Sequence, residues 1–230
     1  MFIFTIICSL FINKKKEYTD ESRFYRFLLE TTTAIAVFFG RIHLHVTGLE
    51  KVPEDRKFLL VQNHRSNFDP ILSWLVFKKS KLIFITKPKN FTRPVFGAII
   101  WRLRFIGIDR ENPRNALKTI LKAADYIKKG DTSVGLYPEG TRNRGEDAML
   151  PFRHGSLKIA QMAKCPIVVT TMMGSANIAK NFPWRATDVY VDVLDVMEPE
   201  TFETMTTVDL GEHIRDMMMS KVQERLNDRT

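Results

Sequence analysis

The sequence has few of the residues that mark metal or disulfide sites. Only two of its 230 residues are cysteine, Cys8 and Cys165. Two widely separated thiols do not form the disulfide framework of small secreted domains, and they fit a reducing compartment. The five histidines contain no HExxH pair, and His43 and His45 alternate on a strand-like stretch without neighbouring cysteines. No metal site is therefore expected.

Motifs for nucleotide binding and covalent catalysis are also absent. No two glycines stand at GxG spacing and there is no GxxxxGK[ST] loop, which excludes the common dinucleotide and P-loop fingerprints. There is no GxSxG nucleophile elbow, and neither cysteine has a suitable base beside it. An acyl-enzyme formed on serine or cysteine is therefore not expected.

Positive charge is present and is unevenly placed. The net charge is +9, and residues 78–118 hold eleven lysines or arginines against only Asp109 and Glu111, so this segment carries the whole excess. Such a patch is typical of proteins that meet an acidic membrane surface, a phosphorylated small molecule or nucleic acid, but it also occurs as an ordinary solvated surface. No nucleic-acid-binding signature accompanies it, so a nucleic-acid partner is not expected.

The first forty residues are unusually apolar. The run MFIFTIICSLFI is followed by NKKK, but twelve apolar residues fall short of the roughly 20 that a spanning helix needs. The positive charges follow the run, whereas in a signal peptide they precede it. A second apolar stretch at 24–40 is interrupted by Arg26 and Glu30. We expect residues 1–40 to form two membrane-associating helices, with Lys14–Lys16 near anionic headgroups. The alternative is a pair of ordinary amphipathic helices that pack on the domain.

From residue 42 onward, short β-rich runs alternate with helical stretches. This alternation predicts an α/β fold with a mixed, largely parallel sheet covered by helices, which forms one domain over residues 41–230. Continuously apolar runs such as VGLY and IVVTTM are typical of strands buried on both faces. The expected strands are 41–46, 57–63, 81–86, 105–108, 133–137, 166–172 and 188–196, and the expected helices are 69–77, 93–104, 112–130, 154–164 and 208–226.

Three polar stretches follow predicted strands. They are NHRSNFD at 63–69, IDRENPR at 108–114 and YPEGTRNR at 137–144. Ligands of open α/β sheets bind beyond the carboxyl ends of the strands, so we expect these stretches to meet at one edge.

His64 is the histidine that stands at this edge near an acid. Imidazole is suited to take a proton near neutral pH, and Asp69 could hold one ring nitrogen while the other faces a substrate. Asp69 also immediately precedes Pro70, so the alternative is that it is simply the N-cap of the helix over 69–77.

The stretch after the 133–137 strand offers an anion site. The sequence PEGT, from Pro138 through Glu139 and Gly140 to Thr141, suits a type I turn with proline at its second position. Arg142 presents a planar fork that suits a phosphate, and Thr141 with the turn amides adds donors. Positive charge from Arg110 and Arg114 would add to this at the start of the helix predicted over 112–130, where anions are already favoured.

Together these residues resemble the 1-acyl-sn-glycerol-3-phosphate acyltransferase (lysophosphatidic acid acyltransferase) family of the glycerolipid acyltransferases. NHRSNFD resembles the family's NHxSxxD block, FIGIDREN the second block, YPEGTR the third and CPIVVTTM the fourth, in order over roughly residues 42–180. The resemblance implies His64 as base and Asp69 as its orienting acid, and it implies a substrate-binding set made of Arg110, Glu139, Gly140, Thr141 and Arg142.

The resemblance also implies a reaction and its partners. An acyl group would pass directly from acyl-CoA or acyl carrier protein to the free hydroxyl of lysophosphatidate, giving phosphatidic acid, with no metal or other cofactor. The protein would work at the cytoplasmic face of the cell membrane, on an anionic membrane surface. An acyltransferase for glycerol 3-phosphate or another lysolipid is the alternative, and a non-catalytic basic membrane- or nucleic-acid-binding protein is a further one.

Overall fold

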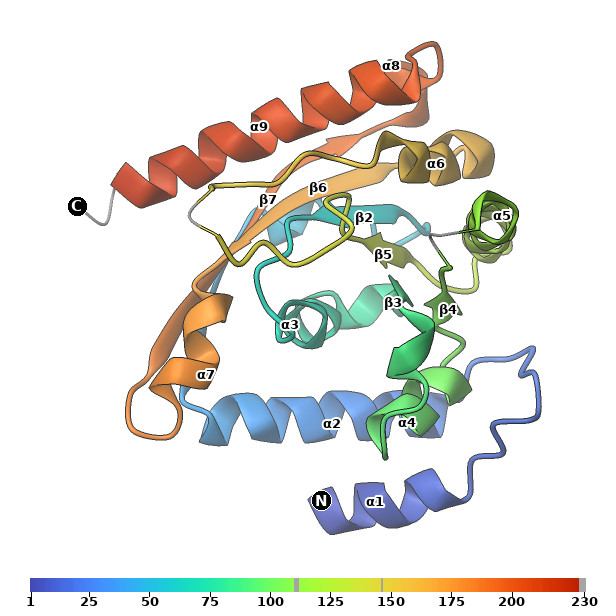
Figure 1. Ribbon diagram of the computed structural model, residues 1–230, viewed down its shortest axis with the longest axis vertical. Helices are drawn as coiled ribbons and strands as arrows, with labels where there is room; N and C mark the ends of the chain where they lie inside the picture. Colours follow the sequence, from blue (N-terminus) through green and yellow to red (C-terminus); the bar gives the residue numbers. More distant parts are fainter. Residues whose placement is uncertain (110–111, 146, 228–230) are drawn as a thin grey trace.

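A computed structural model describes residues 1–109, 112–145 and 147–227 of the chain. Within these ranges seven strands form one sheet in the order β1-β7-β6-β2-β5-β3-β4 (Figure 1). Every neighbouring pair is parallel except β6 with β7, which is antiparallel. The predicted α/β fold with a mixed, largely parallel sheet is confirmed. The strands are β1 (Ile42–Thr47), β2 (Leu59–Gln62), β3 (Ile83–Thr86), β4 (Ile106–Gly107), β5 (Val134–Leu136), β6 (Ile167–Met173) and β7 (Thr187–Met197).

The central strands are the most apolar ones in the sequence. Every residue of β2 and β5 is buried, as are the first six of β6. Helices cover both faces of these strands, so neither face can be polar. β1 lies at the edge of the sheet, and its side chains alternate between half-buried and exposed. The position of a strand in the sheet therefore follows its hydrophobic pattern.

Helices lie on both sides of the sheet. Figure 1 shows α6 and α9 on one side and α2, α3 and α4 on the other. The helices are α1 (Phe2–Leu10), α2 (Arg23–Phe39), α3 (Asp69–Val76), α4 (Phe96–Arg102), α5 (Pro113–Lys128), α6 (Lys158–Ala163), α7 (Ile178–Asn181), α8 (Pro199–Phe202) and α9 (Thr207–Asn227). Short 3-10 turns are η1 (Leu49–Lys51), η2 (Lys78–Ser80), η3 (Pro88–Asn90), η4 (His154–Leu157) and η5 (Ser175–Asn177).

Local signals set the ends of several helices. The side chain of Asn112, the first residue of the helix predicted over 112–130, caps α5 by accepting from the backbone N–H groups of Arg114 and Asn115. The helix predicted over 93–104 is shorter. α4 begins at Phe96 because Val95 adopts a positive φ of 56°, and it ends at Arg102, shortly before Arg104 at a φ of 62°. A residue with positive φ cannot continue a right-handed helix.

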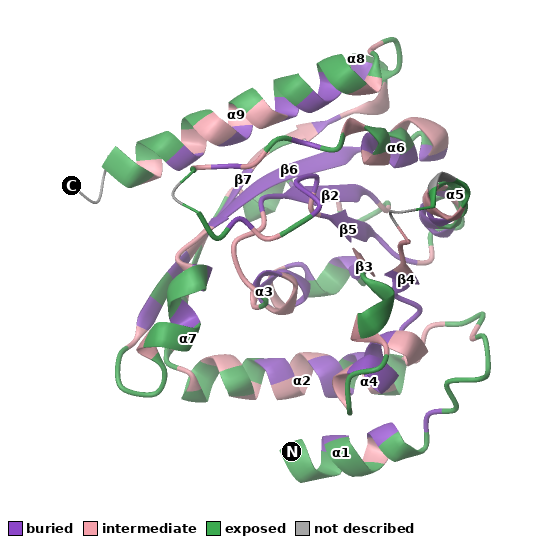
Figure 2. Cartoon of the chain, viewed as in Figure 1, coloured by how far each residue is buried: buried purple, intermediate pink, exposed green. Residues whose placement is uncertain are grey.

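The N-terminal helices form a hairpin that packs on the sheet's covering layer. α1 and α2 are joined by a hydrogen bond between the Thr5 and Thr32 hydroxyls, and Trp74 on α3 donates its Nε1–H to Thr33 on α2. Leu28 on α2 is almost completely buried. The outward face of α1 is exposed and apolar (Figure 2). Among the described residues, no helix combines the length and hydrophobicity needed to span a bilayer.

Candidate active site

The parallel order β2-β5-β3-β4 brings the carboxyl ends of four strands to one edge. His64 follows β2, Lys87 follows β3 and the Tyr137–Arg142 stretch follows β5. The expected convergence of the polar stretches is therefore seen for the first and third of them. In the second stretch Arg110 and Glu111 lie outside the described residues, so the phosphate contact expected of Arg110 stays a prediction.

His64 and Asp69 form a hydrogen-bonded pair. His64 Nδ1 lies 2.8 Å from Asp69 Oδ2, and the same oxygen accepts from the backbone N–H groups of Arg65 and Ser66, each at 2.7 Å. Asp69 is the first residue of α3, the N-cap position is occupied by Phe68, and no side chain caps the helix. The alternative that Asp69 serves only as an N-cap is therefore wrong. The tight turn over residues 64–69 bends the histidine back onto its aspartate.

A serine distant in sequence completes the shell around Asp69. Ser175, just beyond β6, donates its hydroxyl to Asp69 Oδ1 at 2.5 Å. The carboxylate thus accepts from four donors while its side chain is only 1% exposed. Because a carboxylate only accepts, His64 Nδ1 carries the hydrogen, and in the neutral imidazole the lone pair is therefore on Nε2. No residue in the described ranges bonds Nε2, and the His64 side chain is 18% exposed.

Glu139 supports the backbone of this turn from below. Its Oε1 accepts from the His64 N–H at 2.6 Å and its Oε2 accepts from the Leu150 N–H at 2.9 Å. Burial raises the pKa of the Glu139 carboxyl, against the lowering effect of these two bonds. Glu139 does not line the pocket, so the structure places it behind the site and not at the substrate contact expected from the sequence.

Tyr137 forms the floor beneath the His64 ring. The two rings stack with centroids 4.0 Å apart and planes 15° from parallel, and Phe84 stacks on the other side of Tyr137 at 5.3 Å. Gly135 permits this arrangement, because a Cβ there would overlap the Phe84 ring. Burial, with a smaller contribution from the Asp69 charge, raises the pKa of the Tyr137 hydroxyl well above its ordinary value. The tyrosine is therefore a neutral platform that fixes the imidazole plane.

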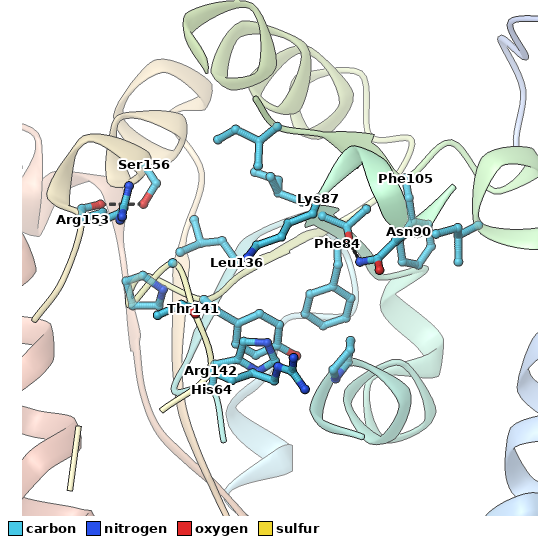
Figure 3. A pocket seen from close by; sticks show the side chains of 18 of the residues that line it. His64, Phe84, Lys87, Asn90, Phe105, Leu136, Thr141, Arg142, Arg153 and Ser156 are labelled. Atoms are coloured by element: carbon cyan, nitrogen blue, oxygen red, sulfur yellow. Dashed lines mark hydrogen bonds between the residues drawn. The ribbon is translucent and has the colours of Figure 1, made fainter. Parts of the chain in front are cut away.

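A pocket of about 470 Å³ opens beside the imidazole. This volume lies within the usual range of small-molecule sites. Figure 3 shows His64, Thr141 and Arg142 entering from one side, with Phe84, Asn90 and Phe105 on another. The deeper walls are apolar and come from α3, α4, α5 and the neighbouring strands; they include Ile71, Trp74, Phe96, Ile100, Phe105 and Ile120.

The turn after β5 delivers three of the expected residues to this pocket. Gly140, Thr141 and Arg142 all line it. The Gly140 N–H donates to the Tyr137 carbonyl at 3.0 Å, and Gly140 adopts a φ of 72°, so the chain reverses here as the PEGT pattern predicts. Arg142 has no ion-pair partner among the described residues, which leaves its guanidinium available to an anion.

The structure also brings residues to the site that the sequence did not single out. The pocket's cationic groups include Lys87, Lys89, Arg93 and Arg153, besides Arg142. The first three belong to the basic 78–118 segment. The excess of charge there predicted an anionic partner, but the sequence did not show which of these cations face a pocket. Asn63 exchanges two hydrogen bonds with the backbone of Met172 and so ties the His64 turn to β6. For Ser175 the sequence offered no signal.

Comparisons with known proteins agree with one another. The family model described as "Acyltransferase" matches residues 43–173, which is more than half of the chain. Proteins named 1-acyl-sn-glycerol-3-phosphate acyltransferase are similar to it: that of Haemophilus influenzae is 28% identical over 83% of this chain and 81% of its own. That of Streptococcus pneumoniae is 29% identical over 84% and 73%, and the human alpha form is 27% identical over 81% and 66%.

A solved structure shares the fold. The 1-acyl-sn-glycerophosphate acyltransferase PlsC of Thermotoga maritima superposes with a TM-score of 0.71 at 23% identity, and the match covers 96% of this chain and 86% of that one. This likeness establishes the common architecture of the two chains.

Proposed function

The chain belongs to the acyltransferase family, and from this premise we propose that it acylates the free hydroxyl of 1-acyl-sn-glycerol 3-phosphate, giving phosphatidic acid. The names of its relatives support this acceptor. The observation that carries the proposal is the His64 imidazole, held through Nδ1 by a buried carboxylate while its other nitrogen faces a pocket that is apolar inside and cationic at its rim. That combination suits a reactant with a fatty chain and an anionic head.

His64 acts as a general base. Its Nε2 takes the proton of the acceptor hydroxyl as that oxygen attacks the thioester carbonyl carbon. When the carbon–sulfur bond breaks, the thiolate recovers the proton from the imidazolium, so the enzyme ends the cycle unchanged. Asp69 keeps the tautomer and stabilises the transient imidazolium, and the proton transfer contributes roughly 10²–10⁴-fold in rate. No nucleophilic serine or cysteine takes part.

Arg142 binds the phosphate of the acceptor. Its guanidinium can take two phosphate oxygens at once, and Thr141, whose hydroxyl is a further donor, lies beside it on the same turn. Because this turn also supports the His64 turn through the Asn143 N–H, which donates to the His64 carbonyl at 2.7 Å, phosphate binding fixes the hydroxyl relative to the base. Arg110 remains a proposed second contact.

The acyl donor is a thioester of coenzyme A or of acyl carrier protein. The apolar walls from α3, α4 and α5 accept the chain, and the cations Lys87, Lys89 and Arg93 offer charge to the phosphates of coenzyme A or to an acidic carrier. The reaction as proposed uses no metal or other cofactor.

The protein works on an anionic membrane surface, at the cytoplasmic face of the cell membrane. The outward residues of α1 that support this contact are large, apolar and exposed, and they include Ile3 at 75% and Leu10 at 77%. Lys15 and Lys16 are exposed near the end of this face, whereas Lys14 donates to the Phe91 carbonyl. We divide the chain into a membrane-associating part over residues 1–40 and a catalytic domain over 41–230.

An acceptor panel tests the proposal. Purified protein is given radiolabelled acyl-CoA with lysophosphatidate, glycerol 3-phosphate or a neutral lysolipid, and labelled products are separated. We expect phosphatidic acid as the main product. Preferential labelling of glycerol 3-phosphate or of the neutral lysolipid would assign the enzyme to that acceptor, and no transfer from either acyl-CoA or acyl carrier protein would refute the proposed reaction.

A further inference from the structure

The turn that follows α7 exposes two large aromatic side chains outside the N-terminal hairpin. Trp184 is 84% exposed and Phe182 is 57% exposed. Tryptophan is on average a highly buried residue, so a ring this open to solvent is costly unless something covers it. Neither ring lines the pocket beside His64, and the mechanism uses neither of them.

This turn lies at the end of α2. Arg41, two residues beyond the last residue of α2, donates its Nη1–H to the Trp184 carbonyl at 3.0 Å, and its own carbonyl accepts from the Thr187 N–H. At the same end of α2, Phe38 is 76% and Phe39 71% exposed. Figures 1 and 2 show the turn after α7 on the same side of the molecule as α1 and α2, opposite α9.

The turn is ordered by its own hydrogen bonds. The Arg185 N–H donates to the Asn181 carbonyl at 2.8 Å, and the Asn181 side-chain amide donates to Thr187 Oγ1 at 2.9 Å. Ile178 anchors α7 in the core with 3% exposure. The aromatic rings are therefore presented by a fixed scaffold, so covering them requires little further ordering of the backbone.

The charges around these rings are positive. Arg41, Lys180 and Arg185 are exposed, and within the described ranges none of them forms an ion pair. The acid that comes next along the chain, Asp188, is engaged with His43 and His45. Tryptophan flanked by unpaired cations matches the boundary between acyl chains and anionic headgroups.

We propose that the turn over residues 182–185 is a third membrane anchor. Trp184 and Phe182 enter the boundary region of an anionic bilayer, while Arg41, Lys180 and Arg185 meet its phosphates. The inference rests on the proposed function, which places a lipid substrate in such a bilayer. If only the α1–α2 hairpin contacts the bilayer, the molecule is free to tilt about the helix axes relative to the membrane. An additional contact beyond the end of α2 fixes that tilt, and it thereby fixes the direction in which the pocket opens.

Vesicle binding by the full chain tests this anchor. Trp184→Ala and Phe182→Ala are compared with Val208→Ala, whose parent side chain is 52% exposed on α9 across the sheet. We expect Trp184→Ala to weaken cosedimentation with phosphatidylcholine–phosphatidylglycerol vesicles about tenfold, which corresponds to ~1.4 kcal/mol. Phe182→Ala should weaken it less, and Val208→Ala should bind like the wild type.

Fluorescence provides a second readout that does not depend on catalysis. The chain also contains Trp101 and the buried Trp74. Subtracting the emission of Trp184→Phe from that of the wild type isolates the emission of the ring at 184. Lipids brominated near the headgroup end of the acyl chain should quench that difference signal. The anchor is overturned if Trp184→Ala binds vesicles as tightly as the wild type and the lipids do not quench the ring at 184. It is also overturned if the wild type is a dimer that Trp184→Ala dissociates, because a second copy of the chain would then cover the two aromatic rings.

The same variant separates this inference from the proposed function. Trp184→Ala should acylate a short-chain, fully dissolved lysophosphatidate at the wild-type rate but lose rate on lysophosphatidate embedded in vesicles. If Trp184→Ala loses rate on both the dissolved and the vesicle-embedded substrate, the anchor is overturned, because Trp184 is then needed for the fold or the catalytic site itself. If the wild type acylates neither, the proposed function fails, and the quenching experiment alone still decides whether the turn enters the bilayer.

Discussion

Asp69 is the residue around which the site is assembled. Its two oxygens accept from the His64 ring, from two backbone amides of its own turn and from Ser175. The His64–Asp69 pair was predictable from the sequence. The histidine follows a buried strand and the aspartate comes five residues later, so both lie at the same edge of the sheet. Ser175 was not predictable, since it lies 106 residues away and reaches Asp69 only through the pairing of β2 with β6.

Glu139 illustrates how a motif residue can serve the site without touching a substrate. The resemblance seen in the sequence implied that it belongs to the substrate-binding set with Arg142, but only the structure shows both carboxylate oxygens occupied by backbone amides. We expect Glu139→Gln to destabilise the protein by about 1–3 kcal/mol, because one of the two amides loses its acceptor. Chemical denaturation of the variant and the wild type measures this difference.

The pH dependence of this difference follows from the raised pKa of Glu139. A folded-state pKa above the ordinary value of 4.5 means that folding favours the protonated carboxyl. The corresponding contribution to stability is fully present below about pH 4.5 and is lost as the pH rises through the raised pKa. The stability advantage of wild type over Glu139→Gln should therefore shrink across this window. A stability difference between wild type and Glu139→Gln that grows with pH would contradict a raised pKa for Glu139.

Arg142 is the residue proposed to bind the acceptor phosphate. We expect Arg142→Ala to raise the acceptor KM by at least about tenfold, since a charge-assisted bidentate contact contributes roughly 1.5–3 kcal/mol. Arg142→Lys should restore part of the affinity. The matched control is Arg144→Ala, which removes an exposed arginine two residues away that does not line the pocket. An unchanged acceptor KM in Arg142→Ala would place the phosphate elsewhere.

At the scale of elements, local patterns predicted most helices and strands. The capping of α5 by Asn112 and the continuous apolar runs of β2, β5 and β6 are visible in the sequence. The predicted helix over 154–164 is instead the 3-10 turn η4 followed by α6. Elements whose ends depend on positive-φ residues such as Val95 could not be delimited, because that conformation is imposed by the packed structure.

α1 provides the element-scale prediction. Its outward face is apolar while its inner face is tied to α2, so substitutions on the outer face should leave folding intact. We expect Ile3→Glu with Leu10→Glu to reduce binding to anionic vesicles at least about tenfold, because each places a charge where a bilayer's apolar region begins. Thermal unfolding should be unchanged.

The control for α1 places the same charge elsewhere. Leu226→Glu substitutes an exposed leucine near the end of α9, which lies across the sheet from the hairpin. It should bind vesicles like the wild type. Equal losses in the α1 variant and in Leu226→Glu would point to net charge as the cause, and full binding by the α1 variant would remove this helix from the membrane contact.

At the scale of the whole molecule, the sheet order decides which predicted residues meet. Strand–helix alternation predicted the fold class, but the order β1-β7-β6-β2-β5-β3-β4 depends on long-range pairing that no local pattern encodes. That order places the ends of β2, β5 and β3 together, so that His64, Arg142 and Lys87 line one pocket. The N-terminal hairpin packs on α3 and α4, the helices that form two of the pocket's walls.

The most direct measurement is the acyl-transfer rate of His64→Ala beside that of His213→Ala. His213 is an exposed histidine on α9, outside the pocket, so its loss controls for removing an imidazole. With fold and thermal unfolding unchanged in both variants, we expect kcat/KM to fall at least about 100-fold in His64→Ala and to remain at the wild-type value in His213→Ala. Near-wild-type turnover of lysophosphatidate by His64→Ala would contradict the proposal that this imidazole is the base.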